Sequence, residues 1–476
     1  MRKIVAILAV LLSAVLVGCG GGSDSGPVAC RATMANPDLC LTGATASVGA
    51  AASIKFISAD TTNIALKGTG GFGRQEFSTL KFQVFDNAGK PVAGTPVNFV
   101  FSDSNAAQTV GGLTLLPTAT SALDGSMTTV VSAGTIPTSV RVVASISGGI
   151  TTLSNILVIS TGVPDQNHFS LATETGNCEG RDVDQTCSFV TATLGDHFGN
   201  PAPDGTAVNF TTSAGVIGAS CVTGSLPPPG ATPNICTPQT CQTTNSKIGP
   251  GSGTCTVLLR ASNPRPANGR VTILAYAVGE ENLFDANGNN VYDSVDTFTD
   301  KSPDIFRDDN ETGIWSPGEP CIGPNLNGTC STLGDGKYNG VLRSPQVPSA
   351  QTLYVSAQLV QTFSGSHALV SFNPSALSCP AGGTAVVQVA VTDEIGNIMP
   401  AGTTIDLSTV FGTAVGTVSP ASIKVPNVVL AVGQPLTIPT YPVTVGCPSP
   451  AASGQLFVTV TSPTTATITR ASAPIN

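Results

Sequence analysis

Apolar and polar residues alternate along many short stretches of this chain of 476 residues. Four stretches show the alternation most clearly, with apolar residues at every second position: Leu80, Phe82 and Val84; Val140, Val142, Ala144 and Ile146; Val271, Ile273, Ala275 and Ala277; and Leu456, Val458 and Val460. Successive side chains of a strand point to opposite faces, so a period of two predicts strands that are buried on one face. Gly, Pro, Asn and Ser bound these stretches, and no convincing amphipathic helix follows the N-terminal segment. The pattern predicts an all-β protein with the strand spacing of β-sandwiches.

Three segments, which begin at Asp86, Asp196 and Asp393, repeat one pattern of residues. A glycine stands three residues after each aspartate, and a Gly-Thr pair precedes the next alternating stretch: Gly89 and Gly94, Gly199 and Gly205, and Gly396 and Gly402. An aspartate that leads a turn, followed by glycines that can adopt positive φ, connects two strands in this way. The repeat therefore predicts three copies of one β domain.

The repeated pattern resembles the group 1 bacterial immunoglobulin-like domains of invasin- and intimin-type adhesins. The resemblance covers residues 54–160 and 165–280 well. It covers residues 365–470 less closely, because Ile398 replaces the proline that the other two copies have at this position. The resemblance implies tandem immunoglobulin-like β-sandwiches in a cell-surface adhesin or display stalk. No segment corresponds to the receptor-binding part of that group, so the resemblance identifies no ligand.

The N-terminal segment predicts export and lipid attachment. Two basic residues precede an apolar run over residues 4–16, which is shorter than the ~20 residues that cross a bilayer as a helix. Residues 16–19, Leu-Val-Gly-Cys, resemble the lipobox of bacterial lipoproteins, which implies cleavage before Cys19 and acylation of its thiol. Gly20 favours the outer membrane by the same resemblance. An ordinary signal peptide followed by an unrelated cysteine is the alternative.

The cysteine content agrees with an oxidising compartment. Thirteen cysteines leave twelve once Cys19 is set aside, an even number that suits disulfides. Sequence spacing suggests four pairs: Cys30–Cys40, Cys178–Cys187, Cys321–Cys330 and Cys379–Cys447. The remaining four can pair in three ways, which the sequence does not resolve: Cys221, Cys236, Cys241 and Cys255. No C-x-x-C pair is present, so disulfides are favoured over metal–thiolate clusters.

The negative charge is concentrated in one segment. Residues 280–336 contain 12 of the 29 carboxylates but only two basic residues, Lys301 and Arg307, whereas the net charge of the whole chain is −9. An acidic chain without a basic patch is not suited to binding nucleic acid. The distribution predicts a nearly neutral array of β-sandwiches that is interrupted by an acidic insertion over residues 281–345.

Two stretches of this insertion have the ligand spacing of free-standing, EF-like calcium loops. Oxygen ligands stand at positions 1, 3, 5, 7, 9 and 12, with a main-chain carbonyl at position 7: Asp285, Asn287, Asn289, Val291, Asp293 and Asp296 in the first loop, and Asp308, Asn310, Thr312, Ile314, Ser316 and Glu319 in the second. Asn290 and Gly313 occupy position 6, where positive φ is required. Pro303 and Pro317 argue against the flanking helices of an EF-hand. The spacing predicts bound calcium, and solvated turns that bind nothing are the alternative.

Residues for catalysis are scarce. The chain has three histidines, His168, His197 and His367, and no nucleophile motif of the G-x-S-x-G type lies beside them. His197 falls inside the second Asp-led turn, where a neutral turn histidine is expected rather than a base. Calcium spacing explains the acidic positions of the insertion better than paired glycosidase carboxylates do. The sequence therefore predicts a protein that is not an enzyme.

These features predict an order along the chain: a lipoprotein signal peptide (1–18), a tether with a disulfide (19–52), immunoglobulin-like domains (53–162 and 163–280), the acidic insertion (281–345), a return strand or linker (346–362) and a third immunoglobulin-like domain (363–476). The expected function is adhesion or display by an outer-membrane, lipid-anchored stalk that faces the cell surface and is stiffened by calcium. Its expected partner is an unknown surface protein or glycan. One alternative is a surface carbohydrate- or polymer-binding lipoprotein with Trp315 in the ligand site. The other is a structural periplasmic lipoprotein without an external ligand.

Overall fold

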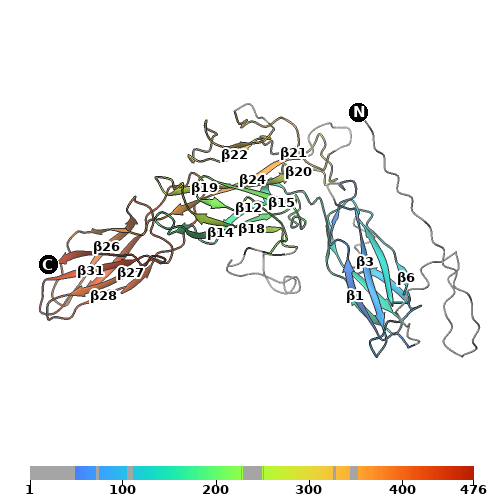
Figure 1. The fold of residues 1–476 in the computed structure, drawn as a ribbon, viewed down its shortest axis with the longest axis horizontal. Helices are drawn as coiled ribbons and strands as arrows, with labels where there is room; N and C mark the ends of the chain where they lie inside the picture. The colour runs from blue at the N-terminus through green and yellow to red at the C-terminus, as the bar shows by residue number, and fades with distance from the viewer. Residues whose placement is uncertain are drawn as a thin grey trace, which may run out of the picture.

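The computed structural model describes residues 49–70, 74–103, 111–226, 228, 249, 251–324, 329–343 and 352–476. They form three β-sandwiches and an insertion, and Figure 1 shows the second and third sandwiches end to end, with the first set at an angle to them. Among these residues, no helix is long and apolar enough to cross a membrane. The predicted all-β class is confirmed. The predicted signal peptide, Cys19 and most of the tether lie outside the described residues.

The first sandwich contains two four-stranded sheets and a small third sheet. One sheet has the order β1 (Ser53–Ala59), β3 (Phe77–Phe85), β7 (Ser126–Ser132), β5 (Thr114–Leu115). The other has the order β10 (Ile150–Leu153), β9 (Val142–Ile146), β4 (Pro96–Phe101), β6 (Thr118–Thr120). The small sheet has the order β2 (Asn63–Ala65), β11 (Leu157–Ser160), β8 (Thr138–Val140).

The second sandwich begins with the short 3-10 helix η2 (Gln166–His168). One sheet has the order β12 (Phe169–Thr173), β14 (Gln185–Leu194), β18 (Thr254–Ala261), β16 (Val216–Ile217). The other has the order β13 (Asn177–Cys178), β24 (Leu353–Phe363), β19 (Arg270–Gly279), β15 (Ala207–Thr212), β17 (Ser220–Val222). The insertion between β19 and β24 contains four short strands: β20 (Leu283–Phe284), β21 (Thr297–Phe298), β22 (Ile305–Phe306) and β23 (Cys321–Ile322).

The third sandwich repeats the arrangement of the other two. Its sheets have the orders β25 (Ala368–Asn373), β26 (Thr384–Asp393), β30 (Thr440–Gly446), β28 (Thr417–Ser419) and β29 (Ser422–Lys424), β27 (Thr404–Val410), β31 (Gly454–Thr461), β32 (Ile468–Ile475). In all three copies, the first, second and fourth long strands share one sheet, and the third pairs with the fifth in the other. This division is that of an immunoglobulin-like sandwich. The chain is therefore a tandem array of such domains.

The insertion occupies the connection between the last two long strands of the second sandwich. β19 pairs with β24 in antiparallel fashion from Arg270 opposite Thr362 to Gly279 opposite Leu353. The segment after the insertion thus completes the second sandwich. β24 extends to Phe363, so this residue belongs to the second sandwich rather than to the third domain, where the sequence analysis placed it.

The three Asp-led turns have the same internal hydrogen bonds. The carboxylate of Asp86 accepts the N–H groups of Ala88 and Lys90, both at 2.9 Å. The equivalent donors are Phe198 and Asn200 for Asp196, and Ile395 and Asn397 for Asp393. The glycine in each turn has positive φ: 76° at Gly89, 75° at Gly199 and 86° at Gly396. The predicted repeat of a single turn is confirmed.

Four disulfides lie in the described part of the chain. They include three of the pairs suggested by spacing: Cys178–Cys187, Cys321–Cys330 and Cys379–Cys447. The fourth joins Cys221 to Cys255, which selects one of the three pairings left open, and it links β17 to β18 across the two sheets of the second sandwich. Cys30, Cys40, Cys236 and Cys241 lie outside the described residues.

The alternating apolar residues of the sequence form the cores. In the first sandwich, Leu80, Phe82 and Val84 are each fully buried. The ring of Phe82 lies 5.4 Å from that of Phe56 and 5.3 Å from that of Phe99, measured between centroids. The two sheets are therefore joined by aromatic packing at the centre of the first sandwich.

Replacing Phe82 by Ala tests this central contact. Loss of a buried ring leaves a cavity, so we expect the unfolding free energy of the first sandwich to fall by about 3–5 kcal/mol. Val100→Ala is the matched control because Val100 is 56% exposed, and we expect a change within about 0.5 kcal/mol. Urea unfolding of the mature chain measures both. Equal effects of the two substitutions would contradict the assigned core.

Candidate metal centre and the interdomain junctions

Two short ladders of strands close the two acidic loops of the insertion. β20 pairs with β21 on either side of residues 285–296, and β22 pairs with β23 on either side of residues 308–319. Strands thus flank both loops, as the prolines at 303 and 317 suggested. Each loop is held at its base as a separate unit.

The first loop folds around the carboxylates at its two ends. Asp285 accepts the N–H of Asn290 at 2.7 Å, and Asn290 has a φ of 57°, the left-handed conformation expected at position 6. Asp296 accepts the N–H groups of Ala286 at 2.9 Å and Asp293 at 2.8 Å. The carboxylate at position 12 is therefore turned back toward the start of the loop.

The second loop has the same geometry. Asp308 accepts the N–H of Gly313 at 2.6 Å, and Gly313 has a φ of 79°. Glu319 accepts the N–H groups of Asn310 at 3.1 Å and Ser316 at 2.8 Å. Two stretches of different sequence thus adopt one conformation because both have carboxylates at positions 1 and 12 and a residue with positive φ at position 6.

The remaining predicted ligands also contact one another within each loop. Asn287 donates to Asp293 at 2.8 Å in the first loop, and Asn310 donates to Ser316 at 2.9 Å in the second. Further contacts involve positions 5 and 7: the N–H of Val291 donates to Asn289, and the hydroxyl of Thr312 donates to the carbonyl of Ile314. Carboxylate, amide, hydroxyl and carbonyl oxygens are the ligands that calcium prefers. The chemistry of both donor sets fits a hard divalent cation.

Another cluster beside the second loop has a different character. Asp304, Cys321 and Cys330 lie close together, but the two cysteines are joined in a disulfide. A disulfide offers no thiolate to a metal ion. This cluster closes the base of the loop.

One end of the insertion packs against the first sandwich. Leu283, Tyr338 and Leu342 belong to the same hydrophobic cluster as the core of that sandwich. The ring of Tyr338 lies 5.0 Å from that of Tyr292 in the first loop and 5.8 Å from that of Phe298 on β21. The first loop is therefore coupled through aromatic rings to the end of the first sandwich.

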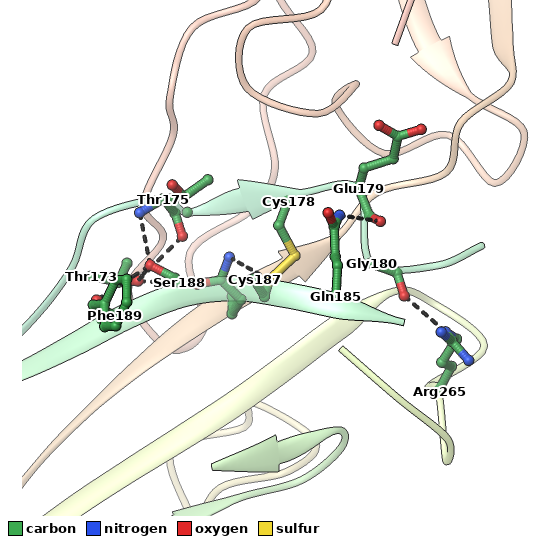
Figure 2. Close-up of a disulfide and its surroundings, with 12 residues drawn as sticks. Thr173, Thr175, Cys178, Glu179, Gly180, Gln185, Cys187, Ser188, Phe189 and Arg265 are labelled. Carbon is green, nitrogen blue, oxygen red and sulfur yellow. Dashed lines mark hydrogen bonds between the residues drawn. A yellow bond between two sulfur atoms is a disulfide. The ribbon is translucent and has the colours of Figure 1, made fainter. Parts of the chain in front are cut away.

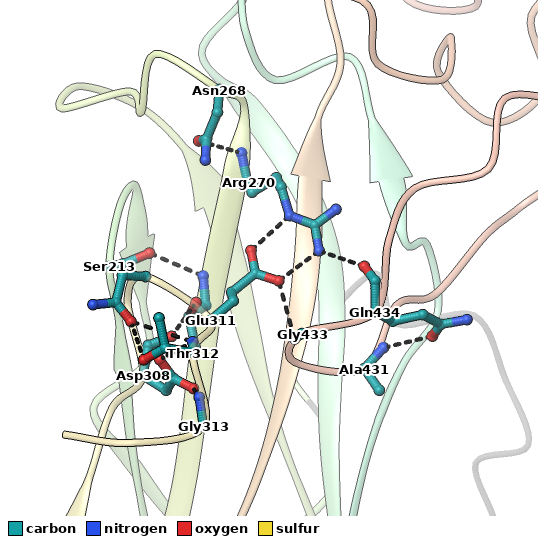
Figure 3. A network of polar contacts seen from close by, with 12 residues as sticks. Ser213, Asn268, Arg270, Asp308, Glu311, Thr312, Gly313, Ala431, Gly433 and Gln434 are labelled. Atoms are coloured by element: carbon teal, nitrogen blue, oxygen red, sulfur yellow. Dashed lines mark hydrogen bonds and ion pairs between the residues drawn. The ribbon is translucent and has the colours of Figure 1, made fainter. Parts of the chain in front are cut away.

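The second loop reaches the third sandwich, as Figure 3 shows. Arg270 on β19 donates to both carboxylate oxygens of Glu311, at 2.6 and 2.5 Å, and to the carbonyl of Gln434 at 3.0 Å. The N–H of Gly433 donates to Glu311 at 3.3 Å. The two charged side chains are only 16% and 13% exposed, so the pair is largely shielded from water. One ion pair thus joins the insertion, the second sandwich and the third.

Main-chain contacts tie the second loop to the second sandwich. The carbonyl of Asp308 accepts the hydroxyl of Thr272 on β19 at 3.1 Å. The N–H of Asp308 donates to Gln358 on β24 at 3.0 Å. Position 1 of the loop is therefore fixed to the two strands between which the insertion begins and ends.

The short strand β13 forms most of the junction between the second and third sandwiches. Asn177 is fully buried, donates to the carbonyl of Met399 at 2.8 Å and accepts the N–H of Val428 at 2.9 Å. Glu179, 1% exposed, accepts the N–H of Thr464 at 2.7 Å. Asn177 on β13 and Glu179 directly after it therefore both contact the third sandwich, and the disulfide Cys178–Cys187 links β13 to β14 (Figure 2). The sequence analysis identified this disulfide but neither of the residues beside Cys178.

Buried acids and histidines gather at the junction between the first and second sandwiches. Asp165, Asp196 and Glu280 are all fully buried. His168 Nδ1 lies 3.1 Å from Asp165 Oδ1, and His197 Nδ1 lies 3.7 Å from Asp165 Oδ2. Burial lowers the pKa of His197, but Asp165, Glu280 and Asp196 raise it by more, so the net shift is upward. The sequence indicated this group of residues only through the repeated Asp-led turn that contains Asp196 and His197.

The comparisons with known proteins concern the fold. No family model matches the chain, and no curated protein is similar to it in sequence. The D0–D1 domain of intimin is 16% identical, with a TM-score of 0.19 over 46% of this chain and 87% of that chain. Invasin, a bacterial integrin-binding protein, is 14% identical, with a TM-score of 0.22 over 89% of this chain and 60% of that one. The Escherichia coli adhesin FdeC is 13% identical, with a TM-score of 0.26 over 91% and 99%.

At these TM-scores the whole chains do not superpose. The fold of this chain is therefore assigned from its own strand order. The class that results is a tandem array of immunoglobulin-like sandwiches, one of which carries an insertion that contacts both neighbours.

Replacing Asn177 by Ala tests the second junction. The substitution leaves the buried carbonyl of Met399 and the half-buried N–H of Val428 without their partner, and the buried group alone costs about 1–3 kcal/mol. We expect the third sandwich to unfold at a lower temperature, in a transition separated from that of the second, in differential scanning calorimetry. Ser170→Ala, on the exposed side of β12, is the control and should leave the transitions unchanged. A single unaltered transition in Asn177→Ala would show that the junction does not couple the two sandwiches.

Proposed function

We propose that this protein is a lipid-anchored stalk on the cell surface that adheres to, or displays itself toward, another surface. The observation that carries the proposal is the path of the insertion, which contacts the first sandwich at one end and the third at the other. A connection between two strands that serves only to join them needs a few residues. This one instead braces both junctions of the array. Bracing suits a protein that must hold its far end away from its anchor.

The anchor rests on the N-terminal sequence. The Leu-Val-Gly-Cys tetrapeptide at residues 16–19 resembles a lipobox, and Gly20 to Gly22 with Ser23 have the composition of a linker. Acylation of Cys19 would hold the chain at the outer membrane. The disulfides of the described residues suit an oxidising compartment outside the cytoplasm.

Calcium would add to the bracing at both junctions. In each loop, the carboxylates at positions 1 and 12 accept main-chain N–H groups of the same loop. A divalent cation bound by both carboxylates would offset their mutual repulsion. The first loop carries Tyr292, which packs toward the first sandwich, and the second carries Glu311, which pairs across to the third. An ion in either loop would therefore restrict a residue that contacts a neighbouring sandwich.

The contacts of Trp315 weaken the case for a glycan-binding insertion. Its indole N–H donates to the carbonyl of Glu319 at 3.1 Å, which uses the ring to close the second loop. The side chain is only partly exposed. A sugar platform needs an open aromatic face, so adhesion through the array is the better-supported function.

Calcium binding is tested by thermal unfolding of the mature chain. At a concentration 100 times its dissociation constant, calcium should stabilise the chain by about 2.7 kcal/mol and raise the melting temperature by roughly 5–10 °C. Asp308→Ala should remove most of this rise. Asp309→Asn is the matched control because Asp309 pairs with Arg307 and stands outside the ligand positions. If calcium shifts neither the wild type nor the control, the loops do not bind it.

Surface exposure is tested by protease treatment of intact cells, followed by blotting for the mature chain. We expect the array to be degraded while a periplasmic marker stays intact. Chelation of calcium should increase cleavage within residues 281–343. Cys19→Ser is the control and should release the chain from the membrane fraction. Full protection of the wild type until the outer membrane is broken would place the protein in the periplasm and overturn the adhesin proposal.

A further inference from the structure

Glu280 lies where the first sandwich, the second sandwich and the insertion meet. Its carboxylate accepts the hydroxyl of Thr161, at the end of the first sandwich, at 3.4 Å and the N–H of Val341, in the insertion, at 3.0 Å. Its main-chain N–H donates to the carbonyl of Pro164, and its carbonyl accepts the N–H of Gln166, at the start of the second sandwich. The side chain is fully buried, so its charge state affects all three parts.

The titratable groups at the junction around Glu280 come from both sandwiches and from the insertion. They include acids, bases and a phenol: Asp165, His168, Asp196 and His197 from the second sandwich, Arg74 from the first, and Glu281, Tyr338 and Arg343 from the insertion. Glu281 accepts two main-chain N–H groups, from Lys301 and Asn339, each at 2.7 Å. These two bonds offset burial only in part, so the pKa of Glu281 is raised as well.

The contacts of Glu280 favour its protonated form. Arg74 lies near Asp196 and His197 lies 3.7 Å from Asp165, and among the described residues no ion pair involves Glu280. Its two partners, a hydroxyl and one N–H, do not compensate a fully buried negative charge. The side chain of Asp165 also has one oxygen, Oδ2, without a hydrogen bond, and His197 Nδ1 faces it. These contacts therefore favour the protonated forms of Glu280 and His197.

We propose that the junction between the first and second sandwiches is a proton-dependent lock, closed while Glu280 and His197 are protonated and released when both lose their protons. Release would charge Glu280 and remove the charge of His197 that faces Asp165 inside the interface. Water would then enter between Thr161 and Glu280 and separate the contacts that hold the first sandwich. The lock does not depend on calcium, because none of its groups is a loop ligand.

The direction of the pH effect follows from the pKa shifts. Burial raises the pKa of Glu280 to about 8, only partly offset by Val341 and His197. The pKa of His197 is also raised, and burial raises that of Asp196. The closed junction therefore binds more protons than an open, hydrated one, so closure is complete at mildly acidic pH and is lost as the pH rises through about 8. Burial raises the pKa of Asp165, but two histidines and the Asn167 N–H outweigh it, so the pKa of this carboxyl is lowered. Protonation of Asp165 would therefore weaken the closed junction only at strongly acidic pH.

Distances between spin labels in the mature chain test the lock. One pair, at Val100→Cys and Val216→Cys, spans the first junction, and a control pair, at Val216→Cys and Val415→Cys, spans the second; all three positions are exposed. From about pH 6.5 to about pH 9.5, we expect the distribution of the first pair to broaden with a midpoint near 8, with or without calcium. The control pair should stay unchanged.

Glu280→Gln supplies the decisive variant because glutamine has the shape of the protonated acid and cannot ionise. We expect its first-pair distribution to remain narrow across the whole range. Broadening in Glu280→Gln equal to that of the wild type would overturn the proposal, as would a wild-type distribution that does not change with pH. The wild-type titration decides the matter even if the variant does not fold.

Discussion

The antiparallel pairing of β19 with β24 is the constraint on which the rest of the structure depends. β19 runs from Arg270, beside the third sandwich, to Gly279, beside the first, a span of about 30 Å. Because its partner β24 follows the insertion in sequence, the insertion leaves and returns at the same end of the second sandwich, where Gly279 lies opposite Leu353. From there it extends along the sandwich to Asp308, which bonds to Thr272 and Gln358, and can therefore contact both neighbours. Without this pairing, the acidic loops would have no defined relation to either junction.

Carboxylates perform three different tasks in this chain, and their surroundings decide which. In the repeated turns, one oxygen of Asp86 accepts two nearby N–H groups and closes the connection between strands. In the insertion, Asp308 and Glu319 do the same across a longer loop, with other oxygens gathered beside them. At the first junction, Glu280 has two hydrogen-bond donors and forms no ion pair with a described residue. The same functional group is thus a turn former, a candidate cation ligand or a proton carrier.

The repeated turn also acquires a second use between domains. The turn at Asp196 lies at the junction with the first sandwich, where its carboxylate is fully buried. The turn at Asp393 lies at the junction with the second, where Asp393 accepts the N–H of Gly365 at 2.9 Å and Asn397 donates to the carbonyl of Asn268 at 2.8 Å. An element that the sequence marks three times as a local turn is, in two copies, part of a contact between sandwiches.

The sequence by itself determined the elements whose causes are local. Alternating apolar residues such as Leu80 and Phe82 predicted the buried faces, and the Asp-Gly repeat predicted the turns, because both depend on neighbours a few positions away. The spacing of ligands predicted which residues of each loop would meet. Only the tertiary structure decided that Cys221 pairs with Cys255, that Glu311 reaches the third sandwich and that Glu280 is buried beside His197. These contacts join residues far apart in the chain, and packing between whole sandwiches brings them together.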